Sequence, residues 1–221
     1  MNRIGIIVLA VGASVASRAQ SGLIQGPFLP GSGNYTTVTG GDFEATNSLA
    51  WFGYEGGWGQ GQVFRESQAA YRGDYGMRMT RLATFGGYAS GTLTNLTVGE
   101  TYVLSAFIKP DTVWQDGMAY IDVMAGAPYT GMGITNMNSS HEDKWHFAYT
   151  TFTVTQPSVV VRVVNATAGA GGIVPDGATT FWDDVAITPV AQFVAPTTVP
   201  EPATLISLGA ALGVLARRRR R

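Results

Sequence analysis

Thr101-Tyr-Val-Leu-Ser-Ala-Phe-Ile-Lys109 is typical of a β-strand that is apolar on both of its faces. Successive side chains of a strand point to opposite sides of the sheet, so residues two apart share a face. One face holds Tyr102, Leu104, Ala106 and Ile108, and the other holds Val103 and Phe107. A strand with two apolar faces is expected in the middle of a sheet that is covered on both sides.

Short segments of the same kind surround this stretch and are separated by Gly and Pro, without a long period of 3.6 residues. Val159, Val161 and Val163 share one face, for example, while Arg162 faces the other way. This pattern predicts an all-β fold, a two-sheet antiparallel sandwich of the jelly-roll type, over residues 34–189. The expected strands are 35–39, 75–82, 89–93, 101–109, 119–125, 145–154, 159–164 and 180–188.

Charge is divided unevenly along the 221 residues. Half of the 14 basic side chains lie at the two ends, and residues 20–199 hold 7 basic and 14 acidic side chains, a net charge of −7. An acidic body repels phosphate backbones, so we expect no nucleic-acid partner. The chain has no cysteine, which excludes disulfides, a thiol nucleophile and a cysteine-ligated zinc site.

The N-terminal residues 1–19 have the build of a secretory signal peptide. Arg3 precedes a short apolar run, and small residues up to Ala19 provide possible cleavage positions. The alternative is an ordinary buried helix. Residues 20–33 follow as an irregular leader that is rich in Gly and Pro.

The C-terminal end has three parts in a row, after an expected linker over residues 190–198. Pro200-Glu201-Pro202 is followed by the apolar run 203–216 and by an arginine cluster. As a helix this run would be roughly 21 Å long, short of a ~30 Å hydrocarbon core. The positive-inside rule keeps the arginines in the cytoplasm and the body outside. The cluster consists of Arg217, Arg218, Arg219, Arg220 and Arg221.

This tail, residues 199–221, closely resembles the PEP-CTERM sorting signal. The resemblance implies processing by an exosortase and transient insertion of a short hydrophobic helix into the inner membrane of a Gram-negative bacterium. It further implies release to the cell surface or the extracellular polysaccharide matrix. The alternative is a permanent tail anchor.

Within the body, Gly41-Asp42-Phe43-Glu44, Gly73-Asp74-Tyr75-Gly76 and Asp183-Asp184-Val185 come in an order that resembles family-4/9-type carbohydrate-binding modules, which are galactose-binding-like jelly rolls. Many members of that family carry a structural calcium ion that links the first and last strands. No Lys or Arg is close in sequence to Asp42, Glu44 or the Asp183-Asp184 pair, so a cation is expected. The resemblance implies Glu44 and Asp183 as ligands, followed by Asp42, Asp184 and the turn around Asp74. The alternative is a set of solvated acids at strand ends.

The segment 51–62 holds four aromatic residues among five glycines, a composition typical of a loop. Flat aromatic rings stack on sugars, and amide or carboxylate groups add directional hydrogen bonds. Burial of Trp51 in the core is the alternative. The candidate sugar platform consists of Trp51, Tyr54, Trp58, Gln60, Tyr88 and Trp114.

No motif of a hydrolase or a dinucleotide-binding enzyme is found, so we expect no enzymatic activity. The leading hypothesis is an exported, non-catalytic protein of the cell envelope or matrix that binds a polysaccharide or cell-surface glycan. The alternatives are a structural or adhesion protein without a sugar site and, less favoured, a small glycan-active enzyme.

Overall fold

The computed structural model describes residues 21–46, 53–55, 61–81, 87–167, 174–175 and 177–199. The expected signal peptide and the apolar run with its arginine cluster lie outside these ranges. In the part of the chain that is described, no helix is long and apolar enough to cross a membrane.

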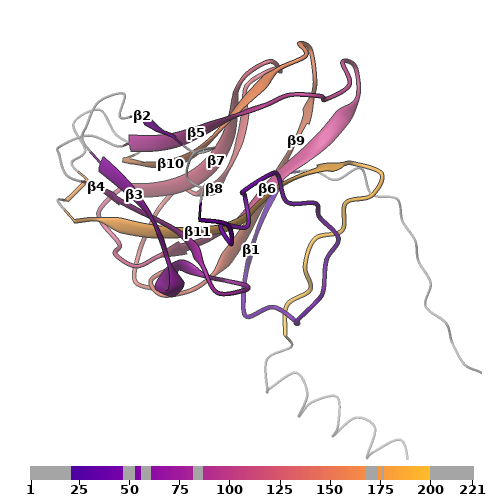
Figure 1. The fold of residues 1–221 in the computed structure, drawn as a ribbon. Helices are drawn as coiled ribbons and strands as arrows, with labels where there is room; N and C mark the ends of the chain where they lie inside the picture. The colour runs from indigo at the N-terminus through magenta and orange to yellow at the C-terminus, as the bar shows by residue number, and fades with distance from the viewer. Residues whose placement is uncertain are drawn as a thin grey trace, which may run out of the picture.

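Two antiparallel sheets make up the fold (Figure 1), which confirms the predicted sandwich. The six-stranded sheet has the order β1-β9-β6-β11-β4-β3, and the five-stranded sheet has the order β2-β5-β10-β7-β8. The strands of the first sheet are β1 (Gly22–Gln25), β9 (His146–Thr153), β6 (Thr101–Pro110), β11 (Thr179–Pro189), β4 (Gly76–Arg81) and β3 (Gly61–Glu66). Those of the second are β2 (Gly53–Glu55), β5 (Gly87–Leu93), β10 (Val159–Thr167), β7 (Gly117–Ala125) and β8 (Thr130–Ile134). A single turn of 3-10 helix, η2 (Ser67–Ala69), follows β3.

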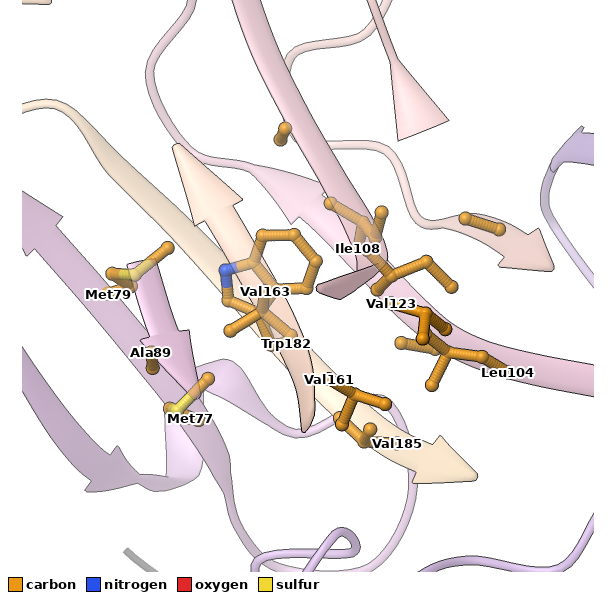
Figure 2. Packing of buried hydrophobic residues seen from close by; sticks show 14 of the residues in the cluster. Met77, Met79, Ala89, Leu104, Ile108, Val123, Val161, Val163, Trp182 and Val185 are labelled. Atoms are coloured by element: carbon orange, nitrogen blue, oxygen red, sulfur yellow. The ribbon is translucent and has the colours of Figure 1, made fainter. Parts of the chain in front are cut away.

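The main core lies between the sheets and follows the alternation of the strands. Leu104 and Ile108 of β6 and Trp182 of β11 meet Val161 and Val163 of β10 there (Figure 2). Strand β6 lies between β9 and β11, and its side chains from 103 to 108 are all buried. The central position expected for this strand is therefore confirmed.

A second, aromatic cluster covers the outer face of the six-stranded sheet. Phe107 of β6 and Phe147 of β9 point away from the main core, and Phe28 packs on them from outside the sheet. Phe28 and Phe107 meet edge to face with ring centroids 5.4 Å apart, a favoured geometry for aromatic pairs. This aromatic cluster, which we call the cover, explains why the second face of β6 is also apolar.

The cover is built by both ends of the described chain. The expected leader includes β1, which pairs with β9, and the segment 34–39 forms isolated bridges in place of the predicted regular strand. Residues 190–198, expected as a linker, pair with this leader: the Leu29 N–H donates to Thr197 O at 2.8 Å and the Asn34 N–H to Val194 O at 2.7 Å. Phe193 stacks on Phe147, and this burial explains why the segment lies against the body.

Candidate functional site

The structure brings together most of the acidic residues that the sequence suggested as calcium ligands. The segment before Asp42 runs beside β11, where the Val38 N–H donates to Val185 O and the Val185 N–H donates to Gly41 O. Strand β11 has a bulge at this point, and Asp184 there has a φ of +49°. Asp42 and Glu44 consequently lie near enough to Asp184 for their charges to act on it, as expected from the pairing of the first and last segments.

Two of these carboxylates hold the loop 71–75 through backbone N–H groups. Glu44 Oε1 accepts from the N–H groups of Asp74 and Tyr75, at 3.0 and 3.1 Å. Asp183 Oδ2 accepts from those of Tyr71 and Arg72, at 2.8 and 2.9 Å. Asp74 thus contributes its N–H to Glu44. This hydrogen bonding partly satisfies the buried carboxylate of Asp183 and the half-buried one of Glu44.

A basic side chain lies beside the acidic group, which corrects the premise that none is near. Arg72 Nε is 3.8 Å from Asp184 Oδ2, an oxygen that also accepts from the Tyr35 hydroxyl at 3.0 Å. Burial raises the pKa of Asp184, and the charges of Asp42 and Glu44 raise it further. Burial also raises the pKa of Asp183 to about 8.

Within the described ranges, no three His, Asp or Glu side chains are close enough together to hold a metal ion. The oxygens of the acidic group are hard ligands of the kind that calcium takes, but several already accept N–H or O–H groups. Calcium therefore stays a prediction.

The outer face of the five-stranded sheet carries a different set of groups. The inward residues of β5, β7 and β10 are apolar, whereas the outward ones include Tyr88, Tyr120, Asp122 and Arg162. The register places Arg162 between Ser90 of β5 on one side and Asp122 of β7 on the other. Tyrosines and charged groups from three neighbouring strands are therefore adjacent on one surface.

At the centre of this surface is a two-point ion pair. Arg162 Nε donates to Asp122 Oδ1 at 2.8 Å and its Nη2 donates to Oδ2 at 2.5 Å. The Asp122 side chain is fully buried, and the hydrogen bonds to it raise the pKa of Arg162. The guanidinium also lies over the Tyr88 ring, 4.9 Å from its centroid, which fixes the two side chains relative to each other.

Tyr120 and Tyr129 extend the surface toward its edge strand β8. Burial raises the pKa of Tyr120 to about 12, with the Asp122 charge as the second cause, so its hydroxyl is protonated at neutral pH and can donate a hydrogen bond. Tyr129 is 68% exposed. Across from Tyr120 lies Gly133, where a Cβ atom would come within 2.5 Å of the tyrosine's own Cβ. Glycine is thus required for β8 to pass this close to Tyr120.

The residues predicted as a sugar platform do not lie together in the structure. Tyr88 lies on the outer face just described, and Tyr54 belongs to β2, where it is opposite Ala89 of β5. Trp51, Trp58 and Gln60 lie outside the described residues. The prediction was wrong for Trp114, which is 5% exposed and belongs to the main core. Its indole N–H donates to Ala166 O, and no face of its ring is open to a ligand.

Sequence reasoning missed Tyr120, Asp122 and Tyr129. The sequence did show that Arg162 lies on the face of its strand opposite to the alternating valines. The same alternation places Tyr120 and Asp122 of β7 on one face. The sequence does not show the pairing of β7 with β10, whose register places Asp122 opposite Arg162.

A second aromatic surface lies at the other sheet. A groove of about 570 Å³ opens where β1 meets the start of β9, and Tyr71 and Trp145 lie in its wall. Trp145 is partly exposed. The other residues that line the groove are Gln25, Gly26, Pro27, Phe28, Asp143 and Lys144.

Comparisons with known proteins bear on the tail and on the fold. Residues 198–221 match the PEP-CTERM protein-sorting motif, as expected from Pro200-Glu201-Pro202 and the arginine cluster. No curated protein matches the chain.

Several solved structures share the sandwich. TmCBM61, solved in complex with β-1,4-galactotriose, is 16% identical with a TM-score of 0.52, over 71% of this chain and 98% of that one. The C-terminal family 22 carbohydrate binding module of Clostridium thermocellum Xyn10B is 12% identical with a TM-score of 0.50, over 75% and 100%. A xylan-binding domain from CBM 22 is 13% identical with a TM-score of 0.51, over 75% and 100%. At these identities the likeness shows a shared fold.

Proposed function

We propose that this protein is exported and binds carbohydrate on the outer face of its five-stranded sheet. The observation that carries the proposal is the group formed there by Tyr88, Tyr120 and Tyr129 around the Asp122–Arg162 ion pair. Tyrosine rings offer apolar faces for sugar rings, and hydroxyl and guanidinium groups offer directional hydrogen bonds. An exposed sheet with these groups is suited to an extended chain molecule such as a polysaccharide.

Rigidity of the surface supports the proposal. The guanidinium of Arg162 is held by two hydrogen bonds to a buried carboxylate and by the Tyr88 ring, so little side-chain entropy is lost when a ligand binds. Strand β2 pairs with β5 beside Tyr88, and Glu55 is opposite that tyrosine. The aromatic segment 51–62 is therefore continuous in sequence with the edge of the same sheet, and Trp51, Trp58 and Gln60 are candidates to extend the platform.

The comparisons support the proposal in two ways. Proteins of the same fold are named for their binding of xylan or are solved with β-1,4-galactotriose. The sorting motif at 198–221 supports export, recognition by an exosortase and transient insertion of the apolar run into the inner membrane. We infer that the body works at the cell surface or in the extracellular matrix, with a glycan as its partner and without catalysis.

Binding of the full chain to a glycan array, followed by calorimetry on the best glycan, tests the sugar site. We expect Tyr129→Ala to weaken binding by about tenfold, equal to ~1.4 kcal/mol. The matched control is Tyr75→Ala, which also removes an exposed tyrosine but lies next to β4, in the other sheet.

The remaining outcomes separate the alternatives. Loss of binding in Trp145→Ala and not in Tyr129→Ala moves the site to the groove beside β1. Binding to no glycan, together with self-association of the chain, supports the structural or adhesion protein. Turnover of the bound glycan supports an enzyme.

A further inference from the structure

The N-terminal leader and the segment that precedes the sorting tail form an uncharged surface on an otherwise acidic body. Residues 21–41 and 185–199 contain no Asp, Glu, Lys or Arg, whereas residues 20–199 together have a net charge of −7. Figure 1 shows the two segments, indigo to purple and yellow, running side by side away from the strands. Their pairing is fixed by the bridges Phe28↔Thr198 and Asn34↔Val194.

This uncharged surface is also apolar on its exposed side. Phe28 is turned into the aromatic cluster and is only 7% exposed, whereas its neighbours along the pairing point outward. Nine large hydrophobic side chains are exposed in the described residues, and four of them belong to these two segments. They are Leu23, Leu29, Val194 and Val199, with exposures of 37%, 39%, 57% and 38%.

The pairing continues to the last residue before the sorting motif. The Val199 N–H donates to Pro27 O at 2.8 Å, and only Pro200-Glu201-Pro202 separates Val199 from the apolar run that begins at Ala203. Three extended residues span roughly 10 Å. A tail inserted in a bilayer therefore keeps Val199 within about that distance of the lipid headgroups, and Leu29 is paired with Thr197, two residues before it.

Charge and hydrophobicity both favour contact at this face. Acidic groups are repelled by anionic headgroups and lose hydration at the interface, so most of the body is unsuited to it. Uncharged segments with exposed Leu and Val gain by burying apolar area at the boundary between headgroups and acyl chains.

We propose that the paired segments 21–34 and 190–199 form a membrane-contacting face, which lies on the bilayer surface while the tail is inserted. The contact orients the body on the membrane and holds Pro200-Glu201-Pro202 at the lipid surface, where a membrane-embedded protease would act. This inference rests on the proposed insertion of the tail, and it adds a lipid-binding surface on the folded body.

Single cysteines provide the test, because the natural chain has none. The full chain is reconstituted into lipid vesicles with an environment-sensitive fluorophore at Leu29→Cys, Val194→Cys, Met124→Cys or Leu208→Cys, in four separate variants. Met124 is 49% exposed on β7 and serves as the matched control on the five-stranded sheet. Leu208 lies in the apolar run and reports insertion of the tail.

We expect the probes at Leu29 and Val194 to shift to the blue and to lose emission when spin-labelled lipid is added, and the probe at Met124 to do neither. If the Leu208 probe is quenched while those at Leu29 and Val194 behave as in water, the membrane face is wrong although the tail inserts. If the Leu208 probe itself stays in water, the proposed insertion fails and the inference fails with it. Blue-shifted Leu29 without quenching by lipid indicates a contact with protein and overturns the lipid proposal.

Discussion

Arg162 covers the carboxylate of Asp122 on the outer face of the five-stranded sheet, and it holds that group at 0% exposure with two hydrogen bonds. A fully buried carboxylate outside the main core has no water to compensate its charge. Its tolerance in the fold depends on this guanidinium, because Arg162 is the only ion-pair partner of Asp122 among the described residues.

Removal of Arg162 alone should therefore destabilise the protein strongly. We expect Arg162→Met to lower the free energy of unfolding by about 3–5 kcal/mol, because Asp122 is left buried and uncompensated. The double variant Asp122→Leu/Arg162→Met removes both charges and should recover most of this loss. Urea unfolding of the two variants measures the difference, and equal losses in both would show that the charge pair is not the cause.

Glycines of the edge strand β8 should differ in their tolerance of a methyl group. A Cβ at Gly133 would lie 2.3 Å from Ala119 O, whereas one at Gly131 would have its nearest contact at 3.1 Å. We expect Gly133→Ala to cost about 1–3 kcal/mol, since the strand must move away from Tyr120, and Gly131→Ala to cost less. Thermal unfolding of both variants checks the order, and the glycan affinity of Gly133→Ala should fall as well if Tyr120 belongs to the site.

Strand β6 shows which features of the fold could be predicted from the sequence. The double apolar alternation of 101–109 predicted a central strand, and β6 has neighbours on both sides. The same sequence could not tell what covers Phe107, because the rings that contact it, Phe28, Tyr35 and Tyr71, come from segments far earlier in the chain. Contacts between the ends of a chain have no local signature, and the paired leader and linker were therefore expected as irregular segments.

The candidate sites show a similar division. Order along the chain was enough to bring Asp42 and Glu44 near the Asp183–Asp184 bulge, because first and last segments of such a sandwich are neighbours. Arg72 was not foreseen as a counterion, although it directly precedes Gly73-Asp74, because the sequence does not show that this loop places it beside Asp184. Trp114 was misjudged because its aromatic character is equally typical of a core and of a platform, and only burial separates the two.

Calcium at the acidic group predicts a response to chelators. If the acidic group around Asp184 binds the ion, calcium at 100 times its dissociation constant should stabilise the fold by about 2.7 kcal/mol, and EDTA should lower the melting temperature. Asp184→Asn should abolish this response. A melting temperature that EDTA leaves unchanged, combined with a lower one in Arg72→Met, would assign the role of counterion to Arg72.

His146 should make stability depend on pH in the acidic range. This side chain is 1% exposed at the start of β9, its Nε2 has no hydrogen-bond partner, and its ring centroid is 5.3 Å from that of His141. Burial lowers the pKa of His146 to about 4, from 6.5, with the charges of His141 and Lys144 as further causes. Below pH 6.5 the unfolded chain therefore takes up the proton before the folded one does.

The contribution of His146 to stability is accordingly complete above about pH 6.5 and is lost as the pH falls toward 4, by on the order of 2–3 kcal/mol. Asp183 and Asp184 act in the opposite direction, because their raised pKa values favour the folded state at low pH and this gain is lost as the pH rises, for Asp183 up to about 8. The measurement is thus best made in the Asp183→Asn background, where His146 should make the slope of the unfolding free energy against pH more positive between pH 4 and 7. His146→Leu in the same background should flatten that slope, and an unchanged slope would place the responsible proton on another group.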